Sequence, residues 1–286
     1  MKPHLVIAAW LALAFLPAAA AESVPVGELR KETHIHGLAV DPQDPSRLFI
    51  ATHHGLFVVD PSGQARRVSE VQDFMGFTPH PADEKTLYAS GHPAGGGNLG
   101  IVVSNDGGAT WRQISPGADG PVDFHQMTIS PADPKVIYGA YGYLQVSRDG
   151  GGTWEKVGRA PLDLIDLAAS ALDPDRLYAA TDSGLLVSRD GGRKWQPQAF
   201  EGETVSLIEA AHGRLYAAVI GRGLMTAEDV EEPNWRELAA APGSGIILHL
   251  AARPSGSNQL YAADHGSIVF ASSDGGQSWT RFGQSP

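Results

Sequence analysis

The sequence predicts an all-β fold, a six-bladed β-propeller, and internal repetition is the main observation behind this prediction. One pattern, S-x-D-x-G-x-x-W, occurs four times, and its Trp residues are 43, 41 and 84 residues apart. A second pattern, a Pro/Asp turn followed by a β-forming run such as LYAA, occurs six times, about 42 residues apart. The high contents of Gly (34) and Pro (20) are typical of chains with many short strands and turns.

Each copy predicts four short strands joined by turns, which is the unit of one propeller blade. The copies make a single domain over residues 22–286, with blades at approximately 34–70, 71–121, 122–163, 164–200, 201–240 and 241–286. The first copy lacks the Asp-Gly pattern, and the fifth carries a degenerate version that ends at Trp235. We expect terminal strands to pair within one blade and close the ring. Both VPVGELRKE and the final SWTRFG compete for that outermost position.

The repeated Asp-Gly hairpins are expected to be structural. Their Ser and Asp side chains can bond to the backbone of their own turn, their Gly residues permit positive φ, and their Trp residues bury apolar surface between blades. The residues concerned are Asp106, Asp149, Asp190, Asp274, Trp111, Trp154, Trp195 and Trp279.

These four motifs resemble the Asp-box, or BNR, repeats of sialidases, sortilin-type receptors and photosystem II assembly factors. The resemblance covers nearly all of the chain after residue 21, and similar repeats occur in secreted bacterial proteins labelled glycosyl hydrolases. It implies a propeller with Asp-box hairpins. Because these families do unrelated things, the resemblance does not select one function.

Residues 1–21 are expected to form a signal peptide. Lys2 precedes the apolar stretch LVIAAWLALAFLPAAAA, and small residues near Ala21 fit a cleavage site. We therefore expect a periplasmic or secreted protein with no membrane span in its mature chain. The chain has no Cys, and its net charge of −11 without basic runs argues against a nucleic-acid partner.

The stretch ETHIHGLAV places His34 and His36 on one side of a predicted inner strand, because side chains alternate with period 2. In a propeller, the start of each innermost strand and the loop between the second and third strands open on one face. Aligning the copies puts several side chains with metal-binding chemistry at these two places: His34, His36, His53, His92, His125, His265 and Met75.

This set predicts a transition-metal site at the mouth of the central channel. Imidazole suits Zn, Cu, Fe and Ni, and thioether favours Cu(I), so we expect copper first and zinc second. Asp73, Asp123 and Asp264 are expected to orient the imidazoles through their remaining N–H groups. The alternative interpretations are a solvated polar lining for the histidines and a core side chain for Met75.

Two other functions stay open. A His-bearing acidic mouth could instead bind a peptide or a protein partner. The resemblance to sialidases would imply an arginine cluster, a Tyr nucleophile and a carboxylate. The side chains available for such roles are Tyr141, Tyr143, Asp166, Glu209 and Arg222. The arginine cluster is missing, which argues against sialidase activity, and no residue pattern assigns a catalytic role.

Overall fold

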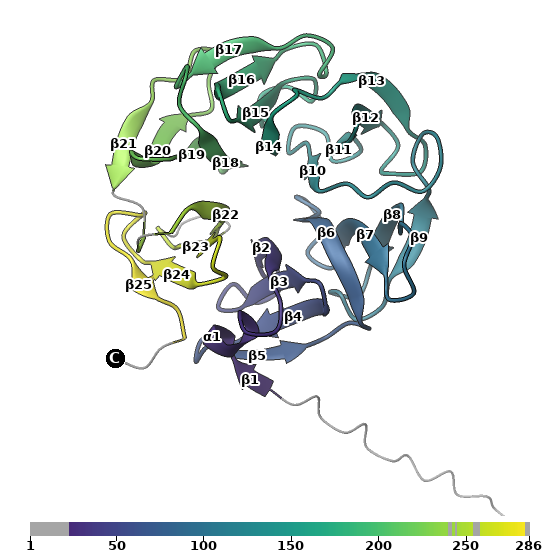
Figure 1. The fold of residues 1–286 in the computed structure, drawn as a ribbon, viewed down its shortest axis with the longest axis vertical. Coiled ribbons are helices and arrows are strands. Elements are labelled where there is room, and N and C mark those ends of the chain that lie inside the picture. The colour runs from purple at the N-terminus through teal and green to yellow at the C-terminus, as the bar shows by residue number, and fades with distance from the viewer. Residues whose placement is uncertain (1–22, 240–241, 244, 254–257, 284–286) are drawn as a thin grey trace, which may run out of the picture.

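The computed structural model describes residues 23–239, 242–243, 245–253 and 258–283, and it confirms the six-bladed β-propeller (Figure 1). The expected signal peptide, residues 1–21, lies outside the described residues. Six antiparallel sheets surround a central channel, and the first strand of each blade lies beside it (Figure 1).

Each blade consists of strands that are consecutive in the chain. The blades are β2 (Ile35–Val40), β3 (Leu48–Thr52), β4 (Gly55–Val59) and β5 (Gln64–Arg67); β6 (Gln72–Pro79), β7 (Leu87–Pro93), β8 (Ile101–Ser104) and β9 (Arg112–Ser115); β10 (Gln126–Ile129), β11 (Ile137–Tyr141), β12 (Tyr143–Ser147) and β13 (Glu155–Arg159); β14 (Leu164–Ala169), β15 (Leu177–Thr181), β16 (Gly184–Ser188) and β17 (Gln196–Ala199); β18 (Val205–Ala211), β19 (Arg214–Val219), β20 (Gly223–Glu228) and β21 (Arg236–Ala239); and β22 (Ile247–Ala252), β23 (Leu260–Asp264), β24 (Val269–Ser272) and β25 (Thr280–Arg281).

The hydrophobic core lies between neighbouring blades. The second strands are buried along most of their length, and β3, β15 and β23 along all of it, because both of their faces pack against another blade. Between the first two blades, Phe49 and Leu56 pack against Phe74 and Leu87, and the box residue Trp111 covers this layer. The alternation expected of a half-exposed strand is therefore absent from the LYAA runs.

The Asp-box hairpins make the contacts expected of structural turns. In the third blade the Ser147 hydroxyl accepts the N–H of Gly151 at 2.8 Å, and Asp149 accepts the N–H of Thr153 at 2.9 Å. Trp154 donates its indole N–H to the Gly151 carbonyl. Gly151 has a φ of +94°, which favours glycine. The Ser and Asp contacts recur in the other three boxes.

The expectation that terminal strands pair within one blade is wrong. The N-terminal strand β1 (Ser23–Pro25) pairs with β5 as a fifth strand of the first blade, whereas β25 stays in the sixth. Side-chain packing closes the ring: Val26 and Leu29 of the short helix α1 (Val26–Leu29) join a core that includes Tyr261 and Val269. Among the described residues, no helix has the length and apolar character needed to cross a membrane.

Candidate metal centre

The expected histidines lie at the mouth of the channel because of how the inner strands begin. The register between β2 and β3 shifts between Ile35 and Gly37, which leaves His36 as the extra residue of a β-bulge. A bulge re-aims a side chain away from the regular ladder. His125 holds the equivalent place immediately before β10.

Cluster 1, defined as His36, His53 and Asp73, joins the first two blades. His36 Nε2 lies 3.0 Å from His53 Nε2, and His53 Nδ1 lies 2.9 Å from Asp73 Oδ2. One ligand atom from each of the three residues lies within 4.8 Å of the others. Two nitrogens on one tetrahedral metal ion are about 3.3 Å apart, given metal–nitrogen bonds of about 2.0–2.1 Å. The imidazole pair therefore has nearly the spacing of a chelating pair.

His36 is held in the neutral form that a metal ligand needs. Burial, and then the nearby charge of His53, lower the pKa of His36 to about 4, although Asp73 acts in the opposite direction. His125 of cluster 2 also contributes to this lowering, so the two clusters influence each other electrostatically.

Cluster 2, defined as His92, Asp123 and His125, joins the second and third blades. Asp123 is almost completely buried, and its Oδ2 lies 3.0 Å from His92 Nε2 and 2.8 Å from His125 Nε2. The ligand atoms again lie within 4.8 Å of one another. The hydrogen bond from His125 to Asp123, opposed by partial burial, raises the pKa of His125.

The tautomer of His92 places a lone pair against this carboxylate. His92 Nδ1 lies 2.7 Å from the carbonyl oxygen of Gly97, and a carbonyl can only accept, so Nδ1 carries the proton. In the neutral ring, Nε2 then directs its lone pair at Asp123 Oδ2. A metal ion bound by both atoms would remove this unfavourable contact between two acceptors. A backbone carbonyl holding the far N–H is also the usual support of a metal-bound imidazole.

Both carboxylates leave one oxygen without a hydrogen-bond partner. Asp73 Oδ1 and Asp123 Oδ1 are buried, and neither has a partner within the described part of the chain. Burying a carboxylate oxygen without a hydrogen-bond partner lowers the stability of the fold, so such an oxygen indicates a binding role. The two Asp residues were expected to orient imidazoles, and the structure places them inside the clusters with oxygens to spare.

The remaining expected residues surround the clusters without joining them. The His34 ring lies 5.9 Å from the His53 ring, and Met75 is buried in the channel wall. His265 accepts the N–H of Ile246 through Nδ1. Asp264 accepts the N–H groups of Gly266 and Ile268, so it stabilises its own turn.

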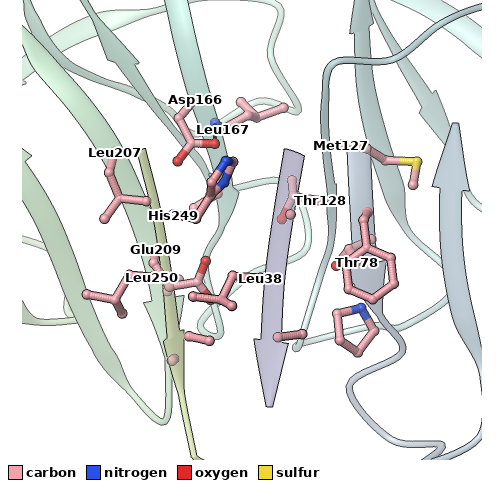
Figure 2. Close-up of a pocket in the computed structure, with 18 of the residues that line it drawn as sticks. Leu38, Thr78, Met127, Thr128, Asp166, Leu167, Leu207, Glu209, His249 and Leu250 are labelled. Atoms are coloured by element: carbon pink, nitrogen blue, oxygen red, sulfur yellow. Dashed lines mark hydrogen bonds between the residues drawn. The ribbon is translucent and has the colours of Figure 1, made fainter. Parts of the chain in front are cut away.

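Behind the mouth, the central channel encloses a cavity of about 840 Å³. Asp166, Glu209 and His249 line it on adjacent blades (Figure 2). Burial raises the pKa of Asp166 to about 7 and, with the charge of Asp166, that of Glu209 to about 8. Burial also lowers the pKa of His249 to about 4. The sequence analysis named Asp166 and Glu209 only as candidate acidic residues, and it did not predict that they share one cavity with His249.

The side chains considered for sialidase chemistry do not assemble into one site. Arg222 pairs with Glu203, and Tyr141 accepts a hydrogen bond from Asn98 in another loop. Tyr143 lies under the ammonium group of Lys156. Among the described residues, no second arginine joins Arg222 in these contacts. The two arginines that share one carboxylate, Arg176 and Arg189, pair with Glu231 instead.

Comparisons with known proteins agree with the repeat and the fold. The BNR/Asp-box repeat profile matches residues 145–156, which confirms the repeat expected from the four motifs. No curated protein sequence matches the chain.

Among solved structures, the GH74 xyloglucanase from Xanthomonas campestris is 20% identical, with a TM-score of 0.59, over 87% of this chain and 45% of that one. YCF48 from Cyanidioschyzon merolae is 17% identical, with a TM-score of 0.53, over 92% and 88%. A chain of the nidogen/laminin complex is 12% identical, with a TM-score of 0.63, over 83% and 93%. The chain spans about half the length of the GH74 enzymes that it matches. At these identities the likeness shows the fold alone.

Proposed function

We propose that this chain, a six-bladed β-propeller with BNR/Asp-box repeats, binds transition-metal ions at the mouth of its channel through clusters 1 and 2. The observation that carries the proposal is the convergence of two imidazole nitrogens and one carboxylate oxygen within 4.8 Å in each cluster. The spare buried oxygens of Asp73 and Asp123 support it, because a cation would satisfy both.

Copper is the first expected ion and zinc the second. A site with two imidazoles and one carboxylate takes Cu(II) more tightly than the other divalent ions of the first row. Met75 lines the channel cavity together with His36 and His125, and its thioether is a further candidate ligand that favours Cu(I). Three protein ligands leave coordination positions open for water or another ligand, so the clusters resemble handling or reactive sites more than closed structural ones.

The test is elemental analysis of the mature protein, purified without a His tag from copper- and zinc-replete cells. We expect close to two ions per chain, one for each cluster. His53→Ala should remove one ion and His92→Ala the other. His54→Ala is the matched control, because His54 neighbours His53 in sequence but contacts the Glu32 carbonyl instead of a cluster. A native protein without copper, zinc or iron, also after reconstitution, would refute the proposal.

A protein partner at the same face is the second candidate. Leu162, Ile220 and Tyr141 are exposed there, with Leu162 95% accessible. A partner that co-purifies with the wild type and with His53→Ala, but not with a Leu162→Asp/Ile220→Asp variant, would support this candidate. An identical set of co-purifying proteins in all three would remove it.

A further inference from the structure

The cavity of the central channel is large enough to hold an organic molecule. Its volume of about 840 Å³ falls within the range of about 300–1,000 Å³ that is usual for small-molecule sites. Its lining runs from His36 and His125 at the mouth to His80 and His212 at the opposite end. A ligand can therefore lie below the metal clusters without contacting them.

One level of the channel wall carries a single ionisable side chain. The residue at this level lies opposite the aromatic residue of the second strand in every blade. The six equivalent residues are Ala39, Thr78, Thr128, Ala168, Glu209 and Ala251. Because five blades contribute only Ala or Thr, Glu209 is the largest side chain at this level.

The surroundings of Glu209 are mostly apolar, and its carboxyl has no hydrogen-bond partner among the described residues. Leu38, Leu207 and Leu250 line the same part of the cavity (Figure 2). Asp166 differs, since its two oxygens accept the N–H groups of Leu167 and Ile208 and so tie β14 to β18. The carboxyl of Glu209 is thus free for a ligand, and that of Asp166 is occupied.

We propose that the channel binds a small organic cation, an ammonium group on an apolar body, with the cation paired to the carboxylate of Glu209. The apolar body would contact the leucines, and the ammonium would make a charge-assisted hydrogen bond. An anion is disfavoured because Asp166 and Glu209 would both have to stay protonated beside it. A bare metal ion is disfavoured because, within the described residues, only clusters 1 and 2 bring three ligand atoms within 4.8 Å.

Binding should release a proton. Asp166 on β14 is the charged group that acts on Glu209, and His249 on β22 is held neutral by burial. With its pKa raised to about 8, Glu209 is mostly protonated at pH 7 in the absence of ligand. An ammonium ion that pairs with it displaces this proton to the buffer while keeping its own charge, so the reaction balances as one cation bound and one proton released.

The test is calorimetric titration of the chelator-treated full mature chain with benzylammonium and, as the matched neutral probe, benzyl alcohol. Titrations in two buffers of different ionisation enthalpy measure the protons released at pH 7. We expect benzylammonium to bind about ten- to a hundredfold more tightly than benzyl alcohol, with close to one proton released. Glu209→Gln, nearly isosteric with the protonated acid, should abolish both the preference and the proton release.

Three results would overturn the proposal. One is equal affinity for the two probes in the wild type. Another is an ammonium preference unchanged in Glu209→Gln. The third is no binding by benzylammonium or by any alkylammonium ion from methyl to hexyl. A thermal melt of the variant establishes that it is folded. Since the metal has been removed, the result does not depend on whether clusters 1 and 2 bind metal.

Discussion

The two faces of the propeller, called here the Asp-box end and the mouth, use the aspartate side chain in opposite ways. At the Asp-box end, Asp149 accepts hydrogen bonds from the Ser147 hydroxyl and from both the N–H and the hydroxyl of Thr153. The Thr153 bonds lead in lowering the pKa of Asp149 to about 2. At the mouth, Asp123 faces two imidazoles and keeps one buried oxygen without a hydrogen-bond partner in the described part of the chain. A repeated Asp whose carboxylate oxygens accept hydrogen bonds from its own turn indicates a structural role. A buried Asp that keeps an oxygen without a hydrogen-bond partner indicates a binding role.

The largest expected effect comes from replacing the two carboxylates at the mouth by amides. Asp73→Asn/Asp123→Asn should weaken binding of Cu(II) and Zn²⁺ at the mouth by about a hundredfold or more, because each cluster loses its only anionic ligand. Competition with a chromophoric chelator measures this change. The metal-free variant should also lose some stability, because the charged Oδ2 atoms of Asp73 and Asp123 contact His53, His92 and His125.

Asp149→Asn is the matched control for this double variant, because it makes the same chemical change at the opposite end. It should lower stability and leave metal affinity unchanged. Equal metal affinity in the mouth variant and the box variant would contradict the distinction between the two ends.

The next largest effect is expected when the Ser hydroxyl of an Asp box is removed. Ser147→Ala leaves the buried N–H of Gly151 without its acceptor, so we expect a loss of about 1–3 kcal/mol in the free energy of unfolding. Urea denaturation measures it. Ser46→Ala removes a similar bond to an Asp in an exposed turn and should change stability by less than about 0.5 kcal/mol. A Ser147→Ala variant that is as stable as the wild type would mean that the boxes are not structural.

Glu209 lies between the two ends and should make stability depend on pH. Its pKa is 4.5 in the unfolded chain and about 8 in the fold, so the folded state binds more protons between these values. Stability from this group is therefore fully present below about pH 4.5 and falls as the pH rises to about 8.

Glu209→Gln should remove this part of the pH dependence. We expect the variant to gain up to about 2 kcal/mol over the wild type at pH 8 and almost nothing at pH 4.5, measured by urea denaturation. The value is well below the full effect of the pKa shift because channel water screens the carboxylate. Asp166, with a pKa raised to about 7, acts in the same direction and leaves a residual slope. A variant whose stability gain is the same at both pH values would show that Glu209 is not held protonated.

The smallest expected effect concerns the choice of ion. Met75→Leu keeps the volume of a buried side chain and should cost less than about 1.5 kcal/mol of stability. If the thioether contributes to the site, Cu(I) affinity falls by about tenfold while Zn²⁺ affinity stays the same. Competition with ion-specific chelators separates the two. Unchanged Cu(I) affinity would assign Met75 to the core alone.

Much of this architecture could be predicted from the repeats, and specific parts could not. The six copies of the Pro/Asp-turn pattern predicted the number of blades, and aligning the copies placed His36 and His125 at equivalent positions near the mouth. The division into two clusters depends on which blade junction each side chain faces, which the strand pattern does not contain. Closure was mispredicted because the short stretch at Ser23–Pro25 suits any exposed sheet edge, and its pairing with β5 is decided by tertiary packing of Val26 and Leu29.

The repeat pattern itself singles out Glu209. It stands where the other five inner strands carry Ala or Thr, and a full alignment of those strands would have exposed the exception. An alignment cannot show the cavity around Glu209. It also cannot show that the two carboxylate oxygens of Asp166 accept backbone N–H groups.

Anomalous X-ray scattering from crystals of residues 22–286, collected at the copper and zinc absorption edges, tests the central claim most directly. We expect one peak in each cluster, with His36 and His53 or His92 and His125 at about 2.0–2.2 Å from the ion and the Asp73 or Asp123 carboxylate completing the set. Crystals from copper- and zinc-containing solution that show no peak at the mouth, or peaks only at the Asp boxes, would contradict it.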